Sequence, residues 1–258
     1  MTAPIPSDLP DLPALPGGPA LFPSPVPATA VVTPVRRPMT AIFRLLTAAT
    51  AATAVTGELL LGSPFQVLSQ FTIQSGILLT LVMTVSARRA WTARRPLPSG
   101  LTGAALLYVV IAALVHHGLL ANPSSPFATP TPPTGWHATT NLVLHTAIPI
   151  AALVNWLFLT ASGQLHLRQA APWLLYPLAY LTFTLARGEL ILPGTPNRYL
   201  YGFLDVAEHG YKSVLGNALL LGLAFYALAV LLVTLDHIRP NPVRHRAKTG
   251  FRLGPTVG

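Results

Sequence analysis

Six long apolar segments, separated by short polar connections, dominate this sequence of 258 residues. They lie at about residues 39–61, 70–87, 100–118, 139–160, 171–187 and 212–237. An α-helix rises 1.5 Å per residue, so ~20 apolar residues cross the ~30 Å hydrocarbon layer of a bilayer. Every backbone polar group needs a partner in lipid, so each segment should be helical. We therefore predict an all-α fold, a polytopic membrane protein with a bundle of about six transmembrane helices.

The composition excludes several other classes of protein. Only 9% of the residues are charged and 52% are hydrophobic, whereas an average soluble domain has about 25% charged residues. The absence of cysteine excludes disulfides, thiolate metal sites and cysteine nucleophiles. The net charge of +9 does not indicate nucleic-acid binding, because the basic residues flank apolar segments. That placement fits membrane topology and anionic lipid headgroups.

The chain divides into three regions. Residues 1–38 contain eleven of the 27 prolines and no apolar segment, which predicts a disordered cytoplasmic tail rather than a signal peptide. Residues 39–238 form the transmembrane domain, and residues 239–258 form a basic cytoplasmic tail. Within the domain, Pro172 suits a first helical turn, whereas Pro149 and Pro177 are expected to kink their helices.

The positions of lysine and arginine predict the orientation of the bundle. With six crossings, thirteen of the 16 basic residues fall on one side, which leaves Arg187, Arg198 and Lys212 on the other. The positive-inside rule makes the side with thirteen cytoplasmic. Both termini are then cytoplasmic, and the protein is expected in the plasma membrane.

Polar and ionisable side chains gather near the outer ends of the predicted helices, while the cytoplasmic halves are almost purely apolar. Such groups are costly near lipid unless they turn inward and pair, so a cluster drawn from several helices indicates a site. Asn141 and His145 share a helix face at a spacing of four residues, as do Thr72 and Ser75 at a spacing of three. The predicted cluster contains Glu58, Thr72, Ser75, His116, His117, Asn141, His145, Arg187 and Asp205.

Two kinds of chemistry are open to this cluster. In one, Thr72 is a nucleophile activated by His145, with Asn141, Arg187 or a helix-three histidine near the oxyanion. In the other, histidines and a carboxylate hold a zinc ion, although the sequence has no H-E-x-x-H motif. The sequence also lacks the G-x-S-x-G motif of α/β-hydrolases.

Short motifs on these segments resemble those of the androgen-induced protein family (AIG/ADTRP-like, FAR-type). The resemblance covers most of residues 40–237 and rests on 71–75, 141–149, 176–180, 187–188, 203–206 and 210–211. Gly76 and Asn155 depart from it, at positions where asparagine and aspartate are expected. Animal members resemble six-helix threonine hydrolases of fatty acid esters of hydroxy fatty acids. The resemblance thus implies that Thr72 is the nucleophile and His145 its base.

The sequence therefore predicts a membrane-embedded threonine hydrolase that acts on lipid esters, with Thr72 and His145 as its catalytic pair. This arrangement requires no cofactor or metal, and its partners are membrane lipids and a lipid ester. The alternative is a non-enzymatic protein that binds or transports lipid, in which the polar cluster holds a headgroup.

Overall fold

The structure is a computed structural model that describes residues 36–129, 133–195 and 197–242. The predicted tails, 1–38 and 239–258, lie largely outside these residues. The described residues form helices and turns and contain no strand, which confirms the all-α prediction.

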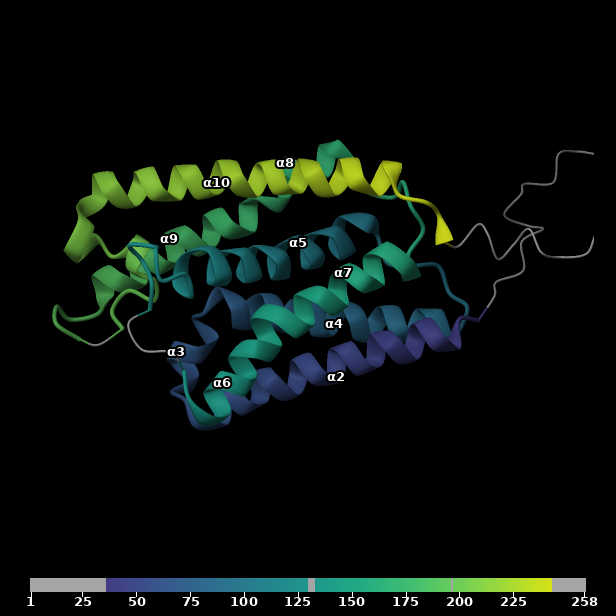
Figure 1. Cartoon of the computed structure of the whole chain (residues 1–258), viewed down its shortest axis with the longest axis horizontal. Helices are drawn as coiled ribbons and strands as arrows, with labels where there is room; N and C mark the ends of the chain where they lie inside the picture. The colour runs from purple at the N-terminus through teal and green to yellow at the C-terminus, as the bar shows by residue number, and fades with distance from the viewer. Residues whose placement is uncertain (1–35, 130–132, 196, 243–258) are drawn as a thin grey trace, which may run out of the picture. The chain divides into compact units, whose positions relative to one another are not determined.

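The main helices run alternately in opposite directions along a common axis (Figure 1). Those long and apolar enough to cross a membrane are α2 (Pro38–Leu61), α4 (Phe71–Trp91), Ser99–Leu120, Gly135–Leu159 and α10 (Val206–Ile238). The third comprises α5 (Ser99–Val115) and the π-helix η1 (His116–Leu120). The fourth comprises α6 (Gly135–Leu142), the π-helix η2 (Val143–Ala147) and α7 (Ile148–Leu159). The short α3 (Pro64–Leu68) connects α2 to α4.

The predicted segment 171–187 forms two helices rather than one. The 3-10 turn η3 (Leu167–Gln169) is followed by the short helix α8 (Ala170–Trp173). Leu174 separates α8 from the longer helix α9 (Leu175–Leu190). Pro177 therefore lies in the first turn of α9, where its missing N–H is tolerated, and not in a kinked helix interior. The 16 residues of α9 are fewer than the ~20 that cross a bilayer, so the count of six crossings stays a prediction.

The core surrounds α5, and α10 is its least buried neighbour. All ten residues from Gly103 to Ala112 are buried, as expected for a helix that is apolar on every face. On α10, by contrast, large apolar side chains such as Leu220, Leu231 and Ile238 are more than half exposed. A soluble monomer rarely exposes apolar surface of this extent. These exposed side chains therefore fit a bundle whose outer surface faces lipid.

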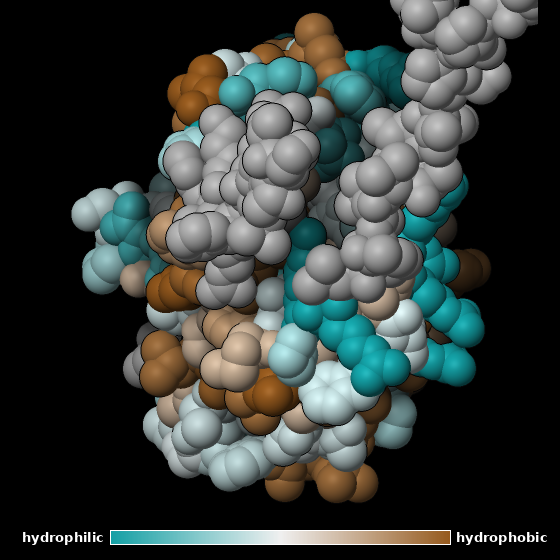
Figure 2. Space-filling model, turned by 90° about the vertical axis from the view of Figure 1, so that its right-hand side faces the viewer, coloured by the Kyte–Doolittle hydropathy of each residue, from teal (hydrophilic) through white to brown (hydrophobic). Residues whose placement is uncertain are grey.

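The end of the bundle where α10 finishes contains buried polar groups. This is the end predicted to be cytoplasmic, and the prediction that its half of the bundle is almost purely apolar is wrong. Asp236 is 1% exposed and accepts hydrogen bonds from Arg239, Trp156 and the backbone of Gln164 and Leu165. Arg239 follows α10 and is buried against this carboxylate rather than lying in a basic tail. Figure 2 views this end and shows hydrophilic residues on it, next to apolar ones.

A second polar contact at the same end joins three helices. Arg44 of α2 donates to the side chain of Asn155 on α7 at 2.8 Å and to the backbone carbonyls of Ser86 and Leu159. Asn155, one of the two departures from the family motifs, thus has a structural partner.

Candidate functional site

The histidines of the site lie on the two π-helical segments. His116 and His117 begin η1, and His145 is the middle residue of η2. A π-turn inserts one extra residue into a helix, and such turns are frequent at functional sites. Here they place His116 and His117 of η1 beside His145 of η2.

A proline accounts for part of this geometry. Pro149 has no N–H to offer the carbonyl of His145, its partner four residues earlier in an α-helix. The ring of His117 contacts this carbonyl instead, and its Nε2 lies 3.2 Å from the carbonyl oxygen. The same ring nitrogen lies 3.0 Å from the hydroxyl of Thr146. His117 therefore supports the backbone that carries His145, and its contacts are to η2 rather than to Thr72.

The central contact of the site joins Thr72 to His145. The Thr72 hydroxyl lies 3.0 Å from Nε2 of His145, although the two residues are 73 positions apart. Nδ1 of the same ring lies 3.1 Å from the backbone carbonyl of Asn141. Because a carbonyl can only accept, Nδ1 carries the hydrogen, and Nε2 of the neutral ring keeps its lone pair. The lone pair then faces the Thr72 hydroxyl, which is the arrangement of a nucleophile beside its general base.

Three further residues of the predicted cluster surround this pair. The ring of His116 stacks on that of His145, with centroids 4.0 Å apart and planes inclined by 24°. The side-chain amide of Asn141 lies 3.2 Å from Nε2 of His116. Ser75, which is 1% exposed, donates to the backbone carbonyl of Thr72 at 3.0 Å. These contacts restrict the ring of His145 and the first turn of α4.

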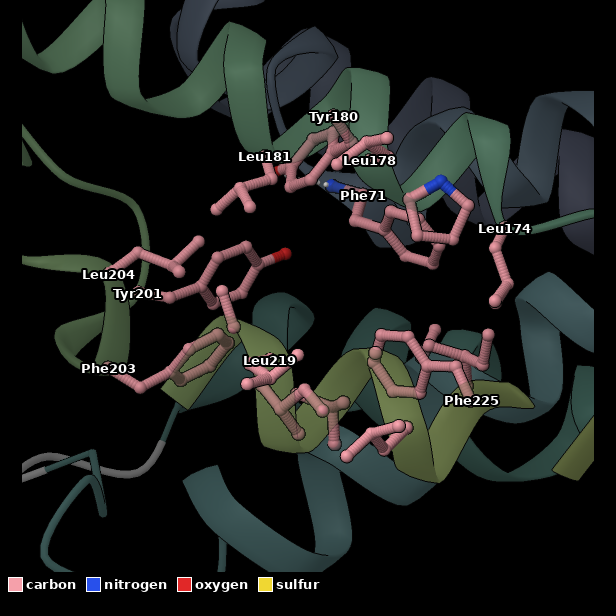
Figure 3. A pocket seen from close by; sticks show the side chains of 18 of the residues that line it. Phe71, Leu174, Leu178, Tyr180, Leu181, Tyr201, Phe203, Leu204, Leu219 and Phe225 are labelled. Atoms are coloured by element: carbon pink, nitrogen blue, oxygen red, sulfur yellow. Dashed lines mark hydrogen bonds between the residues drawn. The ribbon is translucent and has the colours of Figure 1, made fainter. Parts of the chain in front are cut away.

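Thr72 and His145 line a large apolar cavity between α9 and α10. Its volume is about 590 Å³, within the range of small-molecule sites. Figure 3 shows side chains of α9, of α10 and of the segment from Tyr201 to Leu204 converging on this space. The lining contains no aspartate, glutamate, lysine or arginine among the described residues. An acyl chain fits such a lining, whereas a charged group would lose its hydration there.

Two tyrosines at this cavity were not among the predicted site residues. The hydroxyl of Tyr180 donates to the carbonyl of Ser69 at 2.9 Å and accepts from the N–H of Phe71 at 3.2 Å. The other, Tyr201, precedes the 3-10 turn η4 (Gly202–Leu204) and points its hydroxyl into the cavity (Figure 3). Tyr180 belongs to a motif that the resemblance had included. Tyr201 lies in a connection without periodicity, where no sequence signal assigns a direction to its side chain.

The remaining predicted residues make contacts away from Thr72. Glu58 of α2 lies 3.1 Å from Nδ1 of His137 and accepts a hydrogen bond from Thr140. Asp205 is the N-cap of α10 and accepts from the N–H groups of Ala207 and Glu208. A cap of this kind explains an aspartate at that position without a catalytic role.

Arg187 is buried at the end of α9 and does not line the cavity. Its guanidinium donates to the backbone carbonyls of Asn197 and Arg198, at 3.1 and 2.8 Å. The same group lies over the ring of Phe65, 5.5 Å from its centroid. The structure therefore places Arg187 as a support of the loop after α9.

Within the described residues, no group of three or more histidine, aspartate or glutamate side chains is placed to hold a metal ion. Comparison of the chain with family models, curated proteins and solved structures finds no match.

Proposed function

We propose that this protein is a membrane-embedded hydrolase of lipid esters that uses Thr72 as nucleophile and His145 as general base. The observation that supports it most is the 3.0 Å contact between the Thr72 hydroxyl and Nε2 of His145. The backbone carbonyl of Asn141 accepts the hydrogen of Nδ1, so the lone pair of Nε2 faces the Thr72 hydroxyl. The resemblance of the surrounding motifs to the androgen-induced protein family supports the same pair.

The reaction follows from these contacts. His145 removes the proton of Thr72, and Oγ1 forms a bond to the ester carbonyl carbon while the carbonyl electrons move to its oxygen. The tetrahedral intermediate collapses, and the alkoxide leaves with the proton held by His145. Water then gives a proton to the same ring, and its oxygen forms a bond to the carbonyl carbon of the acyl group on Thr72. The bond from that carbon to Oγ1 breaks, Oγ1 takes the proton from His145, and the fatty acid leaves. The apolar cavity beside the pair holds the acyl chain.

The orientation belongs to the same proposal. Six crossings with both termini in the cytoplasm would place the Thr72 end of the bundle at the outer face of the plasma membrane, by the positive-inside rule. Because the chain lacks cysteine, single cysteines can report this orientation. In intact cells, a membrane-impermeant thiol reagent should label Ser125→Cys and not Thr92→Cys. Labelling of Thr92→Cys alone would reverse the orientation.

The decisive experiment measures ester hydrolysis by purified protein in detergent, with and without a chelator. Thr72→Ala and His145→Ala should each lower kcat/KM by about 10³-fold or more, because they remove the nucleophile and its base. Thr80→Ala is the matched control, since its hydroxyl donates only within α4, to the carbonyl of Gly76. A fluorophosphonate probe should label the wild-type protein and Thr80→Ala but not Thr72→Ala.

A second candidate function is binding or transport of lipid without chemistry. The apolar cavity supports it, since a site of this size and lining would bind an acyl chain whether or not Thr72 reacts. Wild-type protein that binds a fluorescent fatty acid but hydrolyses no lipid ester would favour this function. Equal fluorophosphonate labelling of wild type and Thr72→Ala would exclude Thr72 as nucleophile.

A further inference from the structure

The proposed reaction develops negative charge on the ester carbonyl oxygen, and a donor must face that oxygen. Most donors near Thr72 are already engaged. The Ser75 and Tyr180 hydroxyls donate to backbone carbonyls, and the Asn141 amide contacts His116. Loss of one such donor typically lowers kcat by about 10²-fold to 10³-fold in acyl-transfer enzymes.

Tyr201 has the position that this role requires. Its hydroxyl points into the cavity beside Tyr180 (Figure 3), and Thr72 lines the same cavity. The ring is stacked on Phe203 at 5.3 Å and lies edge-on to Tyr180 at 6.4 Å. Burial raises the pKa of the Tyr201 phenol well above its ordinary value, and the nearby Tyr180 hydroxyl adds to this rise. The group is therefore protonated, and able to donate, at neutral pH.

The loop that carries Tyr201 is tied to the end of α9. Arg187 donates to the carbonyls of Asn197 and Arg198, and Arg198 donates back to the carbonyl of Gly188. Tyr199 donates to the carboxylate of Glu189 at 3.0 Å. These bonds act on the residues immediately before Tyr201, and so they restrict where its hydroxyl can point.

A glycine permits this close approach. A Cβ atom on Gly188 would overlap with the ring of Tyr199. Because glycine has no Cβ, the loop can pack directly against the last turns of α9. The buried Arg187 then functions as a positioning residue for the loop, rather than as a group that touches substrate.

We propose that the Tyr201 hydroxyl donates a hydrogen bond to the ester carbonyl oxygen and stabilises the charge that develops on it when Thr72 attacks. Arg187 acts through Tyr201 by holding the loop. The inference rests on the proposed hydrolase function. It adds to the site a hydrogen-bond donor that belongs to a loop rather than to a helix.

The test is a kinetic comparison of the wild type with Thr72→Ala, Tyr201→Phe and the control Tyr176→Phe. Tyr176 lies on α9, and its hydroxyl donates to Gln74. Tyr176→Phe therefore also removes one hydroxyl, but from a residue that does not line the cavity. Tyr201→Phe should lower kcat by about 10²-fold and change KM by less than about twofold, because the bond strengthens in the transition state. Tyr176→Phe should behave as the wild type.

A second set of variants separates this role from a merely structural one. Arg187→Met should also lower kcat, Arg187→Lys should restore part of it, and Tyr201→Phe added to Arg187→Met should cause little further loss. If the loss of kcat in the double variant equals the product of the two single losses, the two residues act independently. That result would overturn the positioning role of Arg187. Thermal unfolding of each variant checks that the fold is retained.

The outcomes distinguish this inference from the function on which it rests. Activity that is lost in Thr72→Ala but unchanged in Tyr201→Phe would overturn the role of Tyr201 and leave the hydrolase intact. A raised KM with unchanged kcat in Tyr201→Phe would make Tyr201 a packing residue and would also overturn the inference. Full activity in Thr72→Ala, or none in the wild type, would overturn both.

Discussion

The buried carboxylate of Asp236 should be among the largest single contributors to the stability of this bundle. Oδ2 accepts from the N–H groups of Gln164 and Leu165 at 2.6 and 2.8 Å. Oδ1 accepts from the indole of Trp156 at 3.1 Å and from Arg239 at 2.8 Å. The aspartate is 1% exposed, and the arginine side chain is 6% exposed. One side chain thus joins α10, α7 and the connection that precedes α8.

Asp236→Ala would remove every one of these acceptors and leave a buried cation without its carboxylate. Breaking a buried ion pair by removing one partner costs about 3–5 kcal/mol. The free-energy cost of leaving the N–H groups unpaired is partly included in this figure, so it does not add to it in full. For a domain of this size, 1 kcal/mol shifts Tm by ~2–4 °C, so the expected decrease is on the order of 10 °C.

The assay is thermal unfolding in detergent, followed by circular dichroism at one scan rate for all variants. Glu208→Ala is the control, because it removes an exposed carboxylate from the same helix and should change Tm only slightly. A Tm of Asp236→Ala within about 2 °C of the wild type would refute the reasoning, since the network would then contribute less than ~1 kcal/mol.

Two further changes test the packing of α5. Gly103→Ala should destabilise the protein by about 1–3 kcal/mol in the same assay, because the new Cβ would lie 2.5 Å from the ring of Trp173. Gly216→Ala, with open space around its Cβ, should be neutral or stabilising, and an equal loss in both variants would contradict this explanation. Tyr108→Phe should cost about 1–3 kcal/mol, because its hydroxyl donates at 2.9 Å to the carbonyl of Trp173, which Pro177 cannot reach. That cost should shrink in a Pro177→Ala background, where a backbone N–H becomes available, and an unchanged cost would contradict the explanation.

Much of the fold was accessible from the sequence because lipid restricts what a chain can form. Apolar length predicts helices directly, and the observed helices begin and end within a few residues of most predicted segments. Pro177 accounts for the break at Leu174, whereas the sequence pattern predicted only a kink at this proline. The burial of Arg239 was missed, because a basic residue after an apolar segment also follows from topology alone.

The candidate site divides in the same way. Helical periodicity placed Asn141 with His145, and Thr72 with Ser75, and the family resemblance named Thr72 and His145 as a pair. The sequence could not assign the tautomer of His145, since this depends on the carbonyl that happens to face Nδ1.

What the sequence by itself determined, then, is which segments are helical, which groups share a helix face, and where prolines interrupt the backbone. These are local properties, because each depends on residues within about one helical turn. Only the tertiary structure decided that η1 lies against η2, that Asp236 meets Arg239 within the bundle, and that a loop returns Tyr201 to the cavity. Contacts between distant segments depend on how the helices pack, and no spacing in the sequence encodes that packing.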